Sequence, residues 1–248
     1  MKAILILLCC LIASSAWASD TKKINITAKS WLVADEHGSV IEGTNVEAIR
    51  SIASITKLMA VIVVLRSGAP LEELLPVKLY NRPVTRQQLM EHALVRSDNT
   101  AAKMLCDTYP QGYHRCVIDM NREAQRLGME NTLFTDPTGL YNTNVSTAKD
   151  LVKLVLSAAT YSPIVQMSNM PRVEMPGSNK KVVIGPNTNP LVGAGMNFVV
   201  SKTGYIRDSG GCIVMIVETL KGLRTVILLG SSSIKTRIPE AKTLAERY

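Results

Sequence analysis

The sequence has few aromatic residues and no long basic segment. Phenylalanine, tryptophan and tyrosine make up 4% of its 248 residues, and no run of basic residues is longer than the pair Lys180-Lys181. A protein that binds nucleic acid normally presents a basic stripe or aromatic side chains that stack on bases. We therefore expect no nucleic-acid partner. The formal charge of +8 is spread along the chain, which favours loose association with anionic surfaces.

The sequence also lacks, near its N-terminus, an apolar run of the about 20 residues that a membrane span needs. A basic start at Met1-Lys2 is followed by a shorter apolar run, from Ala3 to Ala13, and then by small residues up to Ala18. This order predicts a secretory signal peptide over residues 1–18, cleaved near Ala18, and a periplasmic or secreted protein. We expect no stable membrane anchor; a retained N-terminal anchor and lipoprotein processing are the alternatives.

Cysteine is scarce: after the predicted signal peptide, only Cys106, Cys116 and Cys212 remain. In an oxidising compartment, Cys106 and Cys116 are candidate disulfide partners because the segment between them contains Pro110 and Gly112. Two unpaired thiols are the alternative, since the sequence does not give the distance between their Cα atoms. Cys212 lies in an apolar, strand-like run, and we expect it to be buried as a small hydrophobic residue.

Predicted strands lie at both ends of the exported chain, and predicted helices lie in its middle. Alternating and helical patterns give strands over 24–34, 39–42, 181–184, 197–203, 211–218 and 224–230, and helices over 54–66, 85–95, 100–109, 117–127, 147–159 and 239–247. Such an order predicts an α/β fold in which both ends of the chain build one sheet around an inserted helical lobe. We expect one domain over 19–248, with a sheet lobe from about 19–53 and 165–248 and a helical lobe over about 54–164.

Ser54 and Lys57 lie three residues apart in the predicted helix 54–66. Residues at this spacing share a helix face with Cβ atoms about 5–6 Å apart, so the amine can reach the hydroxyl. A serine hydroxyl needs an adjacent base to act as a nucleophile, and a lysine becomes that base when burial and nearby cations lower its pKa. The pair predicts nucleophilic catalysis by Ser54 with Lys57 as its base. A helix-capping serine followed by a surface lysine is the alternative.

Ser97-Asp98-Asn99 falls in a polar break between two predicted helices. The Ser97 hydroxyl could pass a proton between Lys57 and a leaving amine, and Asn99 could hydrogen-bond the amide backbone of a substrate. Asp98 is expected to hold the loop through bonds to the backbone. A turn followed by a helix cap explains the same residues without any function, and this alternative is stronger here than for the other blocks.

Lys202-Thr203-Gly204 is predicted to end a strand that begins near Asn197. Lys202 would supply a second positive charge, which helps to keep Lys57 neutral and attracts a substrate carboxylate, and Thr203 would hydrogen-bond that carboxylate. Gly204 removes a side chain where a peptide must lie against the strand edge. The backbone amides of Ser54 and Tyr205 are the predicted oxyanion hole. An ordinary strand that ends at a glycine turn is the alternative.

The three blocks in this order are the signature of penicillin-binding proteins and class A β-lactamases. The sequence resembles that superfamily over nearly all of the exported chain. Two further segments, Phe134-Thr135-Asp136-Pro137-Thr138-Gly139-Leu140 and residues 144–151, are similar to D-alanyl-D-alanine peptidases of the low-molecular-mass type. The resemblance implies a β-lactamase/transpeptidase-like fold, with a five-stranded antiparallel sheet flanked by helices, and a site between the two lobes. It also implies no metal or cofactor, peptidoglycan stem peptides as substrates, and covalent inhibition by β-lactams.

Two departures from the superfamily pattern narrow the expected activity. The sequence ends at Tyr248, which leaves no room after Gly204 for the C-terminal β domain and membrane helix of the anchored carboxypeptidases. No Glu-x-x-x-Asn pattern lies between Ser97 and Lys202, where class A β-lactamases place the base for deacylation, so we do not expect fast β-lactam hydrolysis. Asp136 is the nearest carboxylate, and the resemblance makes it structural.

The resemblance therefore predicts a serine DD-peptidase similar to the periplasmic endopeptidases that cleave D-alanyl-diaminopimelate cross-links. A D-alanyl-D-alanine carboxypeptidase or a weak β-lactamase is the alternative among enzymes. A β-lactam or muropeptide receptor that is acylated without turnover is the alternative of another class. The oligomeric state does not follow from the sequence.

Overall fold

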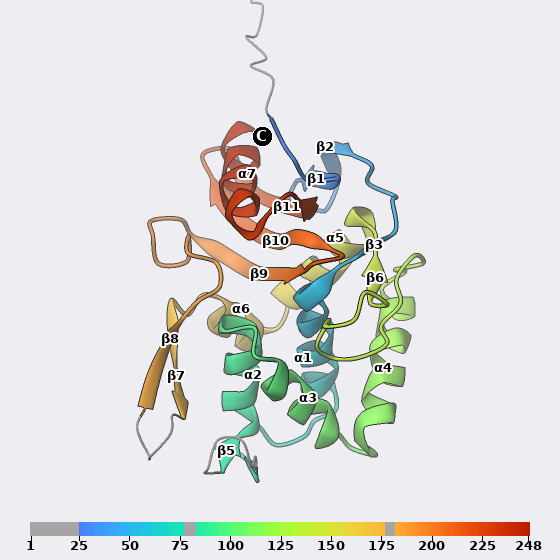
Figure 1. Cartoon of the computed structure of the whole chain (residues 1–248), viewed down its shortest axis with the longest axis vertical. Coiled ribbons are helices and arrows are strands. Elements are labelled where there is room, and N and C mark those ends of the chain that lie inside the picture. Colours follow the sequence, from blue (N-terminus) through green and yellow to red (C-terminus); the bar gives the residue numbers. More distant parts are fainter. Residues whose placement is uncertain (1–24, 77–82, 177–181) are drawn as a thin grey trace, which may run out of the picture.

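A five-stranded antiparallel sheet forms one part of the molecule, and a group of helices forms the other (Figure 1). The structure is a computed structural model that describes residues 25–76, 83–176 and 182–248, so the predicted signal peptide lies outside the described residues. The sheet has the order β2-β1-β11-β10-β9, with neighbouring strands antiparallel. Its strands are β1 (Ser30–Ala34), β2 (Val40–Thr44), β9 (Phe198–Ile206), β10 (Gly210–Thr219) and β11 (Gly222–Ser231). The predicted fold class is confirmed.

The first strand is shorter than predicted, because it begins at Ser30 and not at residue 24. Residues 25–29 lie outside the strand and contact the C-terminal helix, α7 (Ile234–Arg247). There the backbone amide of Thr27 donates to Glu240 Oε1 at 2.9 Å. The Thr27 hydroxyl donates to the same oxygen at 2.5 Å. Thr27 also bonds Ser232, just before α7, so this segment is held by the C-terminal helix and the residues that lead into it.

The last helix begins five residues earlier than predicted, at Ile234 and not at Pro239. Ser233 caps it by accepting from the amides of Lys235 and Thr236. Pro239 lies inside the helix, where its missing N–H removes one early hydrogen bond. The signal for this helix start was therefore the cap at Ser233 and not the proline.

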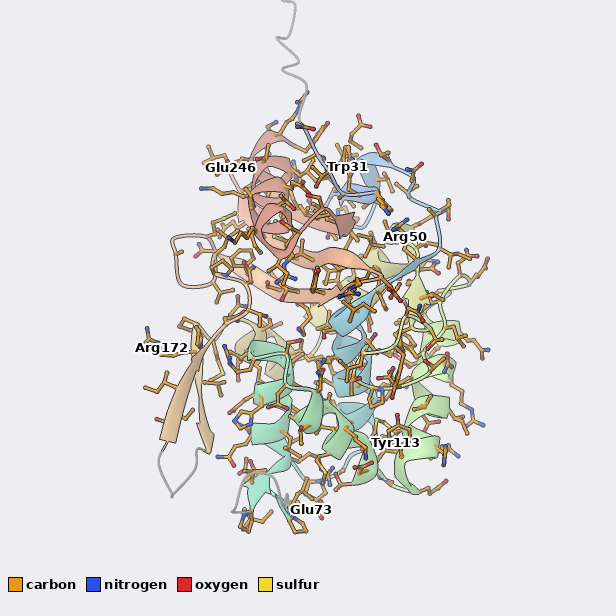
Figure 2. All side chains as sticks on the ribbon, in the orientation of Figure 1. Trp31, Arg50, Glu73, Tyr113, Arg172 and Glu246 are labelled. Carbon is orange, nitrogen blue, oxygen red and sulfur yellow. A yellow bond between two sulfur atoms is a disulfide. The ribbon has the colours of Figure 1, made fainter. Side chains whose placement is uncertain are left out.

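The two faces of the sheet contact different partners, because alternate side chains of a strand point to opposite faces. Helix α7 packs on one face, where Val33, Ile213 and Leu228 meet Ala241 and Leu244. The helices of the middle of the chain pack on the other face (Figure 1). Figure 2 shows Trp31 and Glu246 near α7, and Glu73 and Tyr113 at the far end of the helical part.

The helical part surrounds α1 (Thr56–Arg66), in which every residue from Thr56 to Val64 is buried. The other predicted helices are present, with ends that differ by a few residues. They are α2 (Arg86–Val95), α3 (Asn99–Asp107), α4 (Gly112–Arg126) and α5 (Ala148–Ala159). Helix α4 begins five residues before its predicted start, since Gln111 and Gly112 adopt left-handed backbone conformations that end the preceding turn. The predicted division of the chain into two lobes stays a prediction.

Several short elements were not predicted. Helix α6 (Ser162–Ser168) follows α5, and strand β7 (Arg172–Pro176) pairs with β8 (Val182–Pro186) in a separate hairpin. The predicted strand 181–184 thus belongs to this hairpin and not to the main sheet; residue 181 lies outside the described residues. Shorter pieces are the 3-10 helix η1 (Ala53–Ile55) and strands β3 (Arg50–Ser51), β4 (Leu74–Leu75), β5 (Val84–Thr85) and β6 (Val145–Ser146).

A disulfide joins Cys106 of α3 to Cys116 of α4, with a Cα–Cα distance of 5.3 Å. Both residues are buried, so the link lies inside the helical part and not on its surface. Cys212 is a free, buried thiol on β10, and burial raises its pKa above the ordinary value.

Candidate active site

Ser54 lies in η1, immediately before helix α1, at the junction of the sheet and the helices. Ser54 is not a helix cap, because the N-cap positions of η1 and α1 are Ile52 and Ile55, neither of which makes a side-chain cap bond. The hydroxyl of Thr56 donates to the carbonyl oxygen of Ala53. Ala53 adopts a positive φ of 47°, an unusual conformation for a residue with a Cβ atom. The backbone is thus shaped to present the hydroxyl and not to use it for capping.

Lys57, one helical turn further on, is fully buried and contacts three oxygen atoms. Its Nζ lies 2.8 Å from Ser54 Oγ, 2.7 Å from Asn99 Oδ1 and 2.6 Å from the carbonyl oxygen of Thr138. Burial lowers the pKa of Lys57 to about 7, and the charges of Asp136 and Asp98 oppose that shift. The amine is therefore neutral in a large share of molecules at neutral pH.

The three partners of Lys57 fit a neutral amine. Such an amine has two N–H donors and one lone pair, and the oxygens of Asn99 and Thr138 can only accept. The lone pair is then left for the hydroxyl proton of Ser54. This arrangement is what a serine needs from a base before it attacks a carbonyl carbon.

Ser97 and Asp98 lie in the loop between α2 and α3, and Asn99 begins α3. Ser97 has a positive φ of 57°, a strained conformation of the kind that clusters at functional sites. Asp98 caps α3 by accepting from the amide of Ala101 at 2.9 Å. Asn99 is the first residue of α3, and its side-chain oxygen faces Lys57. The side-chain amide of Asn99 thus lies against Lys57, and the hydroxyl of Ser97 lies against Lys202 of β9.

Lys202 of β9 approaches the same loop from the sheet. Its Nζ donates to Ser97 Oγ at 2.9 Å and to the carbonyl oxygen of Thr203 at 2.8 Å. Burial lowers the pKa of Lys202 well below its ordinary value, and the charges of Lys57 and Arg237 lower it further. We expected Lys202 to keep Lys57 neutral, whereas the main cause of the shift at Lys57 is its own burial. The charge of Lys57 thus disfavours the charged form of Lys202.

Strand β9 is an edge of the main sheet and continues past the Lys202-Thr203-Gly204 block, which does not end it as predicted. Gly204 allows close packing and not a turn, since an added Cβ atom would lie 2.9 Å from Ser54 N and 3.0 Å from Ile52 O. Arg237 of α7 donates to the carbonyl oxygen of Gly204 at 2.6 Å. Gly204 therefore brings the backbone of β9, and the adjacent amide of Tyr205, against the backbone of Ser54.

The segment from Asp136 to Gly139 closes the site on the helical side. The buried Asp136 carboxylate accepts from the amides of Thr138 and Gly139 at 2.6 and 2.9 Å, and also from the side chain of Asn144. These bonds turn the carbonyl of Thr138 toward Lys57. The structural role expected of Asp136 stays a prediction, and this network supports it.

The structure brings the predicted residues of all three blocks to one place, and it adds others that the sequence analysis missed. The contacts of Thr138, Gly139 and Arg237 had no separate signal, although the resemblance already pointed to the segment of Thr138 and Gly139. Arg237 comes from the last helix, about which no motif gave information. The roles of these residues are taken up below.

No group of three or more His, Cys, Asp or Glu side chains that could hold a metal ion is found among the residues that the structure describes. Within the same residues, no helix has the length and apolar character that a bilayer span requires.

The family model of D-alanyl-D-alanine carboxypeptidases matches residues 16–83 and 73–231 of the chain. A D-alanyl-D-alanine endopeptidase of Pseudomonas aeruginosa is 33% identical over 236 residues, which cover 88% of this chain and 76% of the relative. One of Escherichia coli is 36% identical over 222 residues, which cover 82% and 71% of the two chains.

Among solved structures, the DD-transpeptidase of Streptomyces is similar with a TM-score of 0.81 and 25% identity, covering 90% of this chain and 97% of that one. A penicillin-binding protein of Listeria monocytogenes in its ampicillin-bound form has a TM-score of 0.77 and 25% identity, covering 89% and 96%. Fold, sequence and the cluster around Ser54 agree. The chain belongs to the D-alanyl-D-alanine carboxypeptidase family of serine DD-peptidases.

Proposed function

We propose that this DD-peptidase is an endopeptidase that cleaves D-alanyl cross-links between peptidoglycan stem peptides in the periplasm. The observation that carries the proposal is the contact of 2.8 Å between Lys57 Nζ and Ser54 Oγ, in a site where the other two partners of the amine only accept. The similarity to two relatives that carry the name D-alanyl-D-alanine endopeptidase supports the choice of bond.

In the acylation step, Lys57 takes the hydroxyl proton of Ser54 while Oγ attacks the carbonyl carbon of D-alanine. The carbonyl oxygen becomes negatively charged and accepts from the backbone amides of Ser54 and Tyr205, which form the oxyanion hole. Each such donor typically stabilises the transition state by about 3–4 kcal/mol. Lys57 then gives the proton taken from Ser54 to the Ser97 hydroxyl, which passes its own proton to the leaving nitrogen, so that Lys57 is neutral again. The carbon–nitrogen bond then breaks and leaves an ester on Ser54.

In the deacylation step, a water molecule loses a proton to Lys57 and attacks the ester carbon. The carbon–oxygen bond to Ser54 breaks, the hydroxyl regains its proton, and a peptide with a terminal D-alanine carboxylate leaves. No Glu-x-x-x-Asn pattern is available to speed this step, so acylation by a β-lactam is expected to give a long-lived adduct.

The carboxylate beside the scissile bond is held by Lys202 and Thr203, while Asn99 bonds the amide backbone of the substrate and Gly204 lets the peptide lie along β9. A peptide chain would add to the open edge of this strand by backbone hydrogen bonds. In a D-alanyl-diaminopimelate cross-link, the residue after the scissile bond keeps a free carboxylate, as a terminal D-alanine does. The same subsite can therefore serve an endopeptidase and a carboxypeptidase.

Carboxypeptidase activity is the second candidate, since the matching family model is that of D-alanyl-D-alanine carboxypeptidases. Separate digestion of cross-linked muropeptide dimers and of a monomeric pentapeptide distinguishes the two. Loss of dimers supports the endopeptidase, and loss of terminal D-alanine alone would replace it with the carboxypeptidase. A stable adduct with neither product would instead indicate a receptor.

The nucleophile is tested with Ser54→Ala and a fluorescent penicillin. We expect the variant to lose both labelling and muropeptide cleavage, because no other hydroxyl contacts Lys57 among the described hydrogen bonds. Ser39→Ala, at an exposed hairpin turn, is the matched control and should label as the parent does. Normal labelling of Ser54→Ala would overturn the assignment.

A further inference from the structure

A segment outside the three sequence blocks reaches the proposed carboxylate subsite. The Thr203 hydroxyl donates at 2.8 Å to the hydroxyl of Thr188, which follows the hairpin β7–β8. The backbone amide of Thr188 donates to the carbonyl oxygen of Val95 at 3.0 Å, two residues before Ser97. Thr188 therefore touches β9 with its side chain and the end of α2 with its backbone.

The neighbours of Thr188 hold it in this position. The side chain of Asn189, which is buried, donates to Ser201 Oγ at 2.7 Å. Ser201 and Thr203 are two residues apart on β9 and so present their side chains to the same face. The backbone amide of Asn187 donates to the carbonyl oxygen of Pro171 at 2.8 Å. The segment 187–189 is thus bonded to β9 through Asn189 and to Pro171, just before β7, through Asn187.

The hydrogen-bonding capacity of the two hydroxyls decides what Thr188 does. A carboxylate only accepts, so Thr203 must give its one hydroxyl proton to the carboxylate when a substrate binds. In the structure Thr203 is the donor of its bond to Thr188. Once that proton turns to the carboxylate, the oxygen of Thr203 can accept from the Thr188 hydroxyl at the same separation. That second bond fixes the rotation of the Thr203 hydroxyl and polarises it toward the negative charge.

We propose that Thr188 is a positioning residue that directs the hydroxyl of Thr203 toward the free carboxylate of the peptide substrate. The inference rests on the proposed function, because it assumes that Thr203 receives this carboxylate. Thr188 acts through Thr203, and it takes no part in proton transfer at Ser54. Its contribution therefore concerns substrate affinity and depends on the presence of the carboxylate.

The test uses Thr188→Val, which keeps the branched shape and the backbone amide but removes the hydroxyl. With a peptide that ends in a free D-alanine carboxylate, KM should rise by about tenfold, in line with the loss of a hydrogen bond that supports a charged group, while kcat changes little. Thr188→Ser should restore the parent KM. Thr160→Val, whose hydroxyl bonds only Ser157 O at the end of α5, is the matched control and should change neither value.

Two further measurements separate positioning from a structural effect or a direct contact. With the same peptide amidated at its C-terminus, the parent and Thr188→Val should have equal KM values, since no carboxylate is bound. In a Thr203→Val background, adding Thr188→Val should have no further effect. A rise in KM for the amidated peptide, or an additive effect in that background, would overturn the proposal.

The outcome also separates this proposal from the proposed function. If the parent enzyme cleaves the peptide through Ser54 and Thr188→Val has the parent KM, only the role of Thr188 is rejected. If Ser54→Ala is still labelled by penicillin, the proposed function itself fails. Thermal unfolding of each variant checks that a change in KM does not come from loss of folded protein.

Discussion

Gly139 lies against the backbone of Ala53, and a Cβ atom added at Gly139 would stand 2.0 Å from the Ala53 carbonyl oxygen. The same atom would lie 2.9 Å from Ser54 N. No side chain fits between these two backbone segments. The segment that orients Thr138 toward Lys57 is therefore also the support on which the nucleophile rests.

Gly139→Ala should displace the backbone of Ser54 and abolish penicillin labelling. Gly68→Ala is a matched control, because Gly68 has a similar φ of 71° against 75° at Gly139 but has nothing within 4 Å of an added Cβ atom. Both variants should lose about 1–2 kcal/mol of stability from the left-handed backbone. Labelling by fluorescent penicillin, with circular dichroism as a check on folding, should be lost only in Gly139→Ala. Equal labelling of the two variants would contradict the support role.

The acylation rate should rise with pH through about 7, the pKa that burial gives Lys57, and level off above it. The reason is that only the neutral amine accepts the hydroxyl proton of Ser54. Stopped-flow measurement of β-lactam acylation across this range gives the profile. Lys57→Arg keeps a positive charge at every accessible pH, so we expect it to be inactive throughout. A flat profile for the parent enzyme would reject Lys57 as the base.

Lys57→Met should be inactive but more stable than the parent at about pH 6, by an amount on the order of a few kcal/mol. The pKa of Lys57 falls from 10.5 to about 7 on folding, so between these values the unfolded chain binds more protons. The stability of the parent therefore rises with pH across this window, and the full cost of burying the amine is present below it. The unpaired oxygens of Asn99 and Thr138 offset part of the gain in the variant.

Urea unfolding at about pH 6 and about pH 10 measures this difference, which should shrink at the higher value. Lys103→Met removes a lysine that is paired with Asp107 at the surface, so it serves as the control and should show no such trend. A stability difference for Lys57→Met that is the same at both pH values would argue against a lowered pKa.

Replacing both Cys106 and Cys116 by alanine should reduce the free energy of unfolding by about 3 kcal/mol in the chain-entropy description of a loop of this length. Penicillin labelling should persist, because Cys106 lies near the end of α3 that is opposite to Asn99. Guanidinium unfolding of the parent with and without a reducing agent should reproduce the loss. The double variant should not respond to the reducing agent.

Local patterns predicted much of this architecture. The three-residue spacing of Ser54 and Lys57 was enough to predict that the hydroxyl and the amine meet. The positions of Thr138, Thr188 and Arg237 depend on how distant elements pack, so no local pattern could assign their contacts. Lys202-Thr203-Gly204 was wrongly expected to end its strand, because a glycine that permits close packing looks the same in sequence as one that makes a turn.

The pairing of β1 with β11 sets an order of events during synthesis. Ser30 pairs with Leu229, so the first described strand must wait for nearly the whole polypeptide before its partner exists. Such distant pairing predicts slow folding. Ser54 and Lys57 are close in sequence, in η1 and the first turn of α1, and can meet early. Lys202 reaches Ser97 only after β9 has joined the late strands. An incomplete polypeptide would thus contain Ser54 without the strand that binds the peptide substrate. We expect activity only after β9, β10 and β11 have been made.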